Sequence, residues 1–190
     1  SFDTSSVTSM NAMFKNCYQL TSLDFSNFNT NSLETVEEMF CNCTNLYVLD
    51  LSRFDTSKVT SFNKMFDECI NLLFLNLSKC NTSSAKSLEK MFYSCRQMTS
   101  INISSFDTSK VVSMMGTFAE CERLLSLDLP IFDTSSLEDI SYMFSNCAIL
   151  KSLNLNSFDG SSVINANYTF NGCIMLSSLD LSHFKASSVI

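Results

Sequence analysis

The chain repeats itself every 26 residues, and this period constrains its fold more than any other feature. The repeat runs without insertion or deletion, and its consensus reads F-D-T-S-S-V-x-S-M-x-x-M-F-x-x-C-x-x-L-x-S-L-D-L-S-x. Its copies cover residues 2–27, 28–53, 54–79, 80–105, 106–131, 132–157 and 158–183, with a partial copy at 184–190. A fixed period in the twenties is typical of a solenoid, whose units bury their apolar faces against their neighbours.

The first half of each repeat carries apolar residues at a spacing that predicts a short helix. In the first copy these residues are Val7, Met10, Met13, Phe14 and Cys17. At about 100° per residue they lie on one face of a helix. The preceding D-T-S-S segment supplies oxygen atoms that can accept hydrogen bonds from the first helical turn.

The second half of each repeat has the alternating pattern of a half-buried strand. In the second copy Leu49 and Leu51 flank Asp50, and Phe54 then turns back into the core. One strand and one helix per repeat predict an α/β solenoid of seven coils. We expect an arc with a parallel β-sheet on one face and short helices on the other. The whole chain, residues 1–190, is expected to be a single domain that belongs to a longer protein.

The repeat also resembles a known family. L-x-x-L-x-L is the strand half of a leucine-rich repeat, and the segment F-D-T-S-K-V-T-S-F-N-K-M-F-D-E-C-I-N-L-L-F-L-N-L-S covers residues 54–78. This segment is similar to the BspA-like branch of leucine-rich repeats, a 26-residue repeat of bacterial and protist cell-surface proteins. The resemblance covers essentially the whole chain. It implies surface display, adhesion and recognition of other molecules, and it brings no catalytic residues.

The composition excludes several classes of function. The formal net charge is −7, the pI is about 4.6, and Lys plus Arg number only 12, which argues against nucleic-acid binding. The sequence has no apolar run of the length that a transmembrane helix needs. It has a single histidine, His183, and none of the common catalytic or phosphate-binding motifs. We therefore expect a protein that is not an enzyme and that binds no cofactor or metal.

Seven of the nine cysteines follow the repeat, and we expect them to form a buried, reduced column. Their number is odd, and each shares the apolar face of its repeat. They are Cys17, Cys43, Cys69, Cys95, Cys121, Cys147 and Cys173. The other two differ. Cys80 replaces an opening Phe and is expected to be buried, whereas Cys41 stands where most copies have polar residues and is predicted to be an exposed, reactive thiol.

A column of Asp and Asn residues lies between the two strand leucines and must point away from the core. Two interpretations stay open: a solvated ladder, or a polar surface for a protein or glycan partner. Val48 and Phe74 interrupt the serines two places earlier and suggest a contact patch. The candidate partner-binding residues are Asp24, Val48, Asp50, Phe74, Asn76, Asn102, Asp128, Asn154 and Asp180.

Two further sets of residues have local explanations. The column Asp3, Asn29, Asp55, Asn81, Asp107, Asp133 and Asp159 precedes each predicted helix and is expected to cap it. Five sequons for N-glycosylation begin at Asn42, Asn76, Asn81, Asn102 and Asn167. In a secreted eukaryotic protein some of these could carry glycans.

These observations favour a recognition or adhesion module that is secreted or displayed on a cell surface. Its partner would be a protein or glycan that contacts the strand face. The alternative is a structural protein whose copies assemble head to tail into a filament or coat, because the repeats lack recognisable caps at either end.

Overall fold

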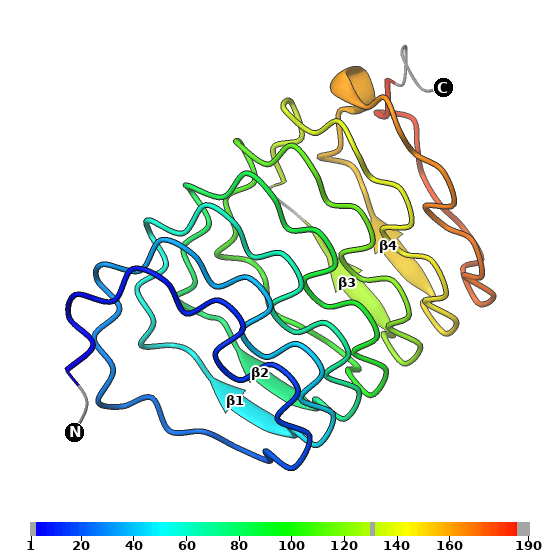
Figure 1. The fold of residues 1–190 in the computed structure, drawn as a ribbon. Coiled ribbons are helices and arrows are strands. Elements are labelled where there is room, and N and C mark those ends of the chain that lie inside the picture. The colour runs from blue at the N-terminus through cyan, green and yellow to red at the C-terminus, as the bar shows by residue number, and fades with distance from the viewer. Residues whose placement is uncertain (1–2, 130–131, 186–190) are drawn as a thin grey trace.

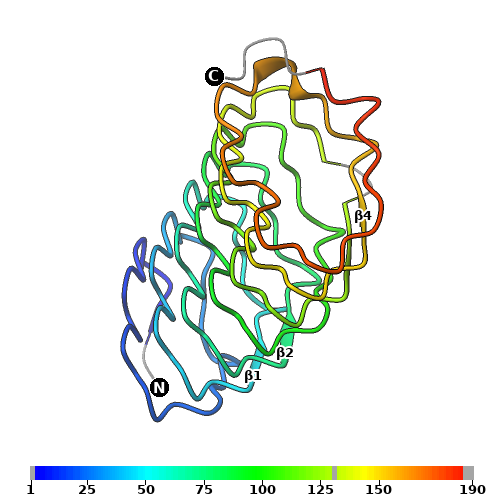
Figure 2. The same ribbon diagram turned by 90° about the vertical axis from the view of Figure 1, so that its right-hand side faces the viewer.

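The computed structural model describes residues 3–129 and 132–185 and shows a stack of similar coils (Figure 1). The chain advances by one coil per repeat from one end of the stack to the other, and a second view shows the coils nearly end-on (Figure 2). The strands are β1 (Val48–Asp50), β2 (Phe74–Asn76), β3 (Ser126–Asp128) and β4 (Ser152–Asn154), and the 3₁₀ helix η1 is Gly160–Ser162. The repeating solenoid predicted from the 26-residue period is therefore present.

The strands lie where the alternating pattern predicts them and pair in parallel, β1 with β2 and β3 with β4. Each strand is only three residues long. The strands form two separate two-stranded sheets in place of the single sheet that was predicted. The strands are short because a side chain bends the chain directly after them. In β1, Asp50 Oδ1 accepts a hydrogen bond from the Ser52 N–H at 2.8 Å, which begins a turn.

The predicted helices are wrong, because within residues 3–129 and 132–185 the only helix is η1. The first half of each repeat is instead a zigzag of turns that bonds to the next coil. The N–H groups of Ala12, Phe14 and Asn16 donate to carbonyls of the second coil at 2.8–2.9 Å. The intervening Met13 and Lys15 N–H groups donate to carbonyls three residues earlier in their own coil.

Left-handed residues explain why this segment imitates a helical pattern without being a helix. Ala12 and Asn16 have φ angles of 52° and 63°, and the equivalent residues of the other coils are also left-handed. A left-handed residue at every fourth position changes the direction of the chain. The apolar side chains of the segment therefore still point to the same side of the coil, as they would in a helix. A left-handed conformation costs roughly 1–2 kcal/mol for a residue with a Cβ atom. The hydrogen bonds between coils offset that cost.

A second parallel ladder runs along the stack at the eighth place of each repeat. Single bridges link successive coils through Ser9, Thr35, Ser61, Ser87, Ser113, Asp139 and Asn165. The side chains at this place also begin turns, since Ser61 Oγ accepts from the Asn63 N–H at 3.4 Å and Asp139 Oδ1 accepts from the Ser141 N–H at 2.8 Å. Neighbouring coils are thus joined by backbone hydrogen bonds on more than one side.

A continuous stack of phenylalanine rings forms the centre of the core. Neighbouring rings lie 5.5–5.8 Å apart between centroids, with planes inclined by 1–14°. The stack comprises Phe14, Phe40, Phe66, Phe92, Phe118, Phe144 and Phe170. Because every coil contributes one ring, burial of each ring depends on the coils on both sides of it.

The cysteine column consists of free thiols, as predicted; it is buried from Cys43 to Cys147, and Cys17 and Cys173 at its ends are partly exposed. The thiol groups also hydrogen-bond between coils: Cys69 Sγ donates to the Phe40 carbonyl at 3.2 Å, and Cys95 Sγ donates to the Phe66 carbonyl at 3.3 Å. Burial raises the pKa of these two thiols well above its ordinary value. Cys80 is buried as predicted, and its Sγ atom lies 3.6 Å from the Thr56 hydroxyl oxygen.

The acidic column that was expected to cap helices begins turns instead. Asp55 Oδ1 accepts from the Ser57 N–H at 2.9 Å, and Asp107 and Asp133 make the same contact with Ser109 and Ser135. The prediction of capping holds for Asp159, whose side chain accepts from the Ser161 N–H at the start of η1. These side chains do accept hydrogen bonds from free backbone N–H groups, as predicted, but except at Asp159 the N–H groups belong to turns and not to helices.

Candidate recognition surface

The Asp and Asn column of the strand face is exposed and is used locally by the fold. Asp24 Oδ1 accepts from the Ser26 N–H at 2.8 Å, and Asn102 Oδ1 accepts from the Ser104 N–H at 3.0 Å. Asn76, Asn154 and Asp180 make the equivalent contact. These hydrogen bonds account for the carboxylate or amide at this place in the repeats whose side chain the structure describes there. The side chain of Asp128 lies outside the described part of the structure.

The apolar patch of the strand face consists of Tyr47, Val48, Leu73 and Phe74. Their side chains are 42–57% exposed. Val48 and Phe74 are register partners on β1 and β2, so they lie side by side on the outward face. The backbone below is fixed, since Leu73 and Phe74 donate N–H hydrogen bonds to the Tyr47 carbonyl at 3.0 and 3.2 Å. Four exposed apolar side chains are therefore held together on a rigid support.

An acidic hollow borders this patch on the same face. It has a volume of about 190 Å³, and its lining includes Asp24, Asp50 and Arg53. Hydrogen bonds from the N–H groups of Ser26 and Ser52 lower the pKa values of Asp24 and Asp50, so both carboxylates are ionised at neutral pH. A partner that covers the apolar patch would meet two negative charges at its edge.

The structure brings together five of the nine predicted partner-binding residues. Asp24, Val48, Asp50, Phe74 and Asn76 belong to the first three coils, beside one another on the strand face. Asn102, Asn154 and Asp180 are exposed further along the stack. Their coils carry serine at the place of Val48 and Phe74, so that part of the column has no apolar neighbours there.

Sequence reasoning missed Tyr47, Leu73 and Arg53. The signal for the first two was present: L-Y-V-L at 46–49 and L-L-F-L at 72–75 are unbroken apolar runs where a half-buried strand should alternate. Arg53 occupies the variable last place of its repeat, and only the folded chain shows that it lines the acidic hollow.

Cys41 was predicted to be an exposed, reactive thiol, and this prediction is wrong. Its side chain is only 8% exposed. Burial, together with the charge of Asp67, raises the pKa of this thiol to about 11, so the nucleophilic thiolate is scarce at neutral pH. The left-handed residues Glu38 and Asn42 on either side redirect the chain, which the expected helical geometry did not anticipate.

The five sequon asparagines differ in exposure. Asn81, Asn102 and Asn167 are exposed, whereas Asn42 and Asn76 are partly buried. Asn42 Nδ2 also donates to Asn16 Oδ1 at 3.1 Å and to the Tyr18 hydroxyl at 3.3 Å, so the nitrogen that would carry a glycan is already engaged. The exposed three therefore remain the better candidates for modification.

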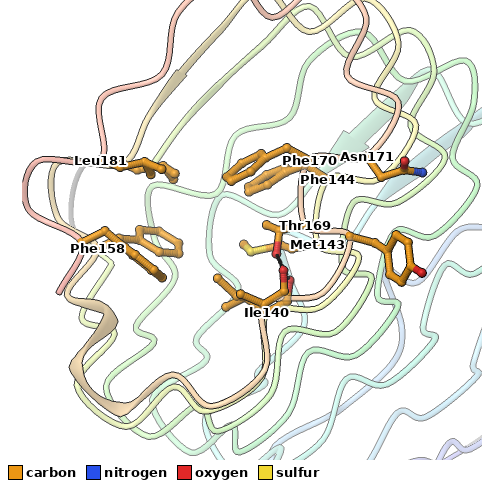
Figure 3. A pocket seen from close by; sticks show the side chains of 12 residues that line it. Ile140, Met143, Phe144, Phe158, Thr169, Phe170, Asn171 and Leu181 are labelled. Atoms are coloured by element: carbon orange, nitrogen blue, oxygen red, sulfur yellow. Dashed lines mark hydrogen bonds between the residues drawn. The ribbon is translucent and has the colours of Figure 1, made fainter. Parts of the chain in front are cut away.

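An apolar pocket of about 380 Å³ lies in the last coils (Figure 3). Phe144 and Phe170, the last pair of the stack, lie on one side of it, and Phe158 and Leu181 lie on another. The Thr169 hydroxyl donates to the Ile140 carbonyl at 3.1 Å and is thereby satisfied. Most of the lining belongs to core columns, but Tyr168 and Leu181 are exposed, so the pocket lies where the core meets the surface in the last coils and offers little polar chemistry.

Metal-binding clusters and membrane-spanning helices are both absent from the described residues. In residues 3–129 and 132–185, no three His, Cys, Asp or Glu side chains converge in a way that could hold a metal ion. Over the same residues, none of the helices has the length and apolar character needed to cross a membrane.

The solved structures that are similar to this chain include two leucine-rich-repeat proteins. One is the T. pallidum leucine-rich repeat protein, with 21% identity, 82% of this chain and 76% of that chain covered, and a TM-score of 0.49. The other is a leucine-rich cell surface protein from Faecalibacterium prausnitzii A2-165, with 14% identity, 93% and 79% covered, and a TM-score of 0.22.

Comparisons with sequences give a family. No curated protein matches the chain. Three overlapping segments, residues 1–72, 42–128 and 63–184, match the family described as "Mycoplasma protein of unknown function, DUF285". Together these segments span nearly all the repeats. The match names this family and not the BspA-like branch that the repeat resembles. The chain therefore belongs to the DUF285 family.

Proposed function

We propose that this protein is a non-enzymatic recognition module of a cell surface or extracellular space, and that it binds a protein partner through the strand face of its first three coils. The single observation that carries this proposal is the apolar patch, whose four side chains are each more than two-fifths exposed. Exposed apolar side chains that gather on one rigid surface mark interaction sites, whereas isolated ones are common everywhere. The remaining strand-face columns are largely polar.

The chemistry of the patch favours a protein over a glycan at this site. Aromatic and aliphatic side chains at the centre of an interface supply most of its binding energy, and a polar rim surrounds them. Tyr47 and Phe74 are the candidate anchors. Asp24 and Asp50 lie at the edge in the acidic hollow. The partner is thus expected to present apolar side chains next to a lysine or arginine.

Localisation at a surface follows from the resemblance of the repeat to surface-protein repeats. The alternative assembly into a filament stays a prediction.

A selection of displayed peptides tests the proposal. The double variant V48S/F74S replaces both residues with the serine that other coils carry at the same place, so it should fold normally. We expect peptides selected on the natural protein to be rich in aromatic and basic residues, and to lose about tenfold or more in affinity for the variant.

Leu125→Ser provides the matched control, because Leu125 is similarly exposed but two coils away from the patch. This control should bind the peptides normally. Peptides that bind V48S/F74S as tightly as the natural protein, or whose binding Leu125→Ser abolishes, would show that the patch is not the recognition site.

A further inference from the structure

A second hollow lies away from the strand face, on the side of the stack formed by the zigzag segments. This side, here called the turn face, consists of the outward side chains of segments such as 88–94 and their equivalents. The hollow has a volume of about 380 Å³, and its lining residues come from four successive coils. It lies within the size range of small-ligand sites. None of its lining residues belongs to the strand-face site.

The hollow lies where one coil has small residues. Gly116 stands in the column of left-handed residues, between Lys90 of the preceding coil and Tyr142 of the following coil. Ala119, which also lines the hollow, stands between Tyr93 and Ser145 in its own column. The missing side chain of Gly116 therefore leaves a gap between two large side chains.

Neither the backbone nor the space requires a glycine at this position. Lys90 and Tyr142 adopt φ angles of 52° and 56° at the same place in the flanking coils, so a side chain is compatible with the conformation. A Cβ atom on Gly116 would lie 3.3 Å from Lys90 Cγ, which belongs to a flexible side chain. The absence of a side chain is therefore not explained by the fold.

The two walls of the hollow carry aromatic rings in fixed positions. On one side, Lys90 Nζ lies 5.3 Å from the centroid of the Tyr93 ring. On the other side, Tyr142 stacks on Tyr168 with centroids 4.9 Å apart and planes inclined by 17°. Although the Tyr142 side chain is 44% exposed, this stacking fixes its ring beside the gap. An aromatic platform is thus already in place before any ligand arrives.

Polar groups surround the aromatic walls. Asn146 Nδ2 donates to Glu120 Oε1 at 2.7 Å, which orients the carboxylate and the amide together. Ser145 and Asn171 also line the hollow. Hydroxyl, amide and carboxylate groups offer both donors and acceptors at short spacing.

This combination suits a sugar ring better than other ligands. A pyranose has one face of C–H groups that can pack on an aromatic ring, and hydroxyl groups at its edge that both donate and accept hydrogen bonds. The hollow holds one ammonium group, Lys90, and one carboxylate, Glu120, in a chain of net charge −7, so an anionic ligand such as a phosphate is disfavoured. We propose that the hollow between Lys90 and Tyr142 binds a pyranose ring of a neutral glycan.

Binding to immobilised neutral tetrasaccharides of glucose, galactose, mannose and N-acetylglucosamine tests this proposal. Gly116→Tyr fills the gap with a third ring beside Tyr142, and Tyr142→Leu removes the platform. We expect at least one saccharide to bind with a Kd below about 5 mM, and both variants to lose about tenfold or more of that affinity. Thermal melting of each variant separates loss of the site from loss of the fold.

Matched controls use the same kinds of change elsewhere. Ala12→Tyr places a tyrosine at the equivalent left-handed position of the first coil, and V48S/F74S removes the apolar patch. Both should bind the saccharide normally. The proposal is overturned if none of the four saccharides binds, if a folded Gly116→Tyr protein binds as well as the natural one, or if sulfated forms are preferred. It is also overturned if V48S/F74S abolishes saccharide binding. In that case the peptide selection still tests independently whether the apolar patch of the strand face binds a protein.

Discussion

The hydroxyl of Thr56 donates a hydrogen bond to the carbonyl of Asn81 at 2.9 Å and accepts one from the N–H of the same residue at 2.8 Å. Thr56 is 3% exposed, and its side chain therefore satisfies two backbone groups of the next coil. Buried threonines at the same place make this double contact in other coils, for example Thr82 with Asp107.

Replacing Thr56 with valine should destabilise the protein by about 2–3 kcal/mol. Valine keeps the shape but leaves the N–H and carbonyl of Asn81 without their partner, and a buried unsatisfied group costs about 1–3 kcal/mol. Thr56→Ser keeps the hydroxyl and should cost about 1 kcal/mol for the lost methyl group. Urea unfolding of the two variants measures the difference, and equal losses would show that the hydroxyl contributes nothing.

Truncation of a ring within the phenylalanine stack should have a cost that depends on its place. Phe92 is fully buried between Phe66 and Phe118, so Phe92→Ala should lower the free energy of unfolding by about 3–5 kcal/mol. Phe170 is partly exposed, and Phe170→Ala should cost roughly half as much. Thermal or urea unfolding checks both values. A Phe92→Ala protein that unfolds like the natural one would contradict the prediction.

Asp67 should make the protein less stable as the pH rises. Its Oδ1 atom is buried and has no hydrogen-bond partner within the described residues. Burial and the charge of Glu68 raise the pKa of this carboxyl to about 6, against the opposing effect of Lys90 and Lys64. Between about pH 4 and pH 6 the folded state binds more protons than the unfolded state, so this group's contribution falls with rising pH and is constant above that range.

Asp67→Asn removes this titration and tests the prediction. Because the carboxyl is partly exposed, we expect the variant to be more stable by roughly 1–2 kcal/mol at pH 7.5, and to lose that advantage near pH 4. Unfolding curves at the two pH values give the comparison. An advantage of equal size at both values would mean that the charge of Asp67 is not the cause.

The two left-handed glycines should respond differently to alanine. At Gly172 the φ angle is +74°, and a Cβ atom would clash with Asn146 Oδ1 and lie 3.3 Å from the Asn146 Cα atom. Both substitutions incur the roughly 1–2 kcal/mol of a left-handed residue with a Cβ atom. Gly172→Ala should cost about 1 kcal/mol or more beyond that, because its Cβ atom also clashes with Asn146, whereas at Gly116 only the flexible Lys90 side chain has to move. Melting temperatures rank the two, and the reverse order would contradict the packing described for Asn146.

The sequence predicted the coil length, the core columns and the place of the strands, because these depend on which side chains recur every 26 residues. It did not predict the zigzag. The apolar residues Met10, Phe14 and Cys17 fit the inner face of a helix and of this zigzag equally well. The difference lies in the positive φ angles at residues such as Glu38 and Lys64, which are seldom left-handed. Those angles are stabilised by hydrogen bonds to a neighbouring coil, which no single repeat contains.

Of the two candidate sites, the sequence predicted one and did not predict the other. Val48 and Phe74 were visible as exceptions in a column of serines. The hollow at Gly116 was not, since a small residue in a variable column carries no signal until the flanking Tyr142 and Lys90 are placed around it. A surface that is built by four coils can be interpreted only once the coils are stacked.

The free thiols of the cysteine column have a mechanical consequence. No covalent bond joins the described coils except the chain itself, and the polar contacts across their junctions are hydrogen bonds and a few exposed ion pairs such as Lys15–Glu38. A force that pulls the two ends of the chain apart should therefore unfold the coils one after another. Each 26-residue coil would release about 90 Å of extended chain as it leaves the stack. Stretching should therefore lengthen the chain in steps of nearly equal size, one step for each coil that unfolds.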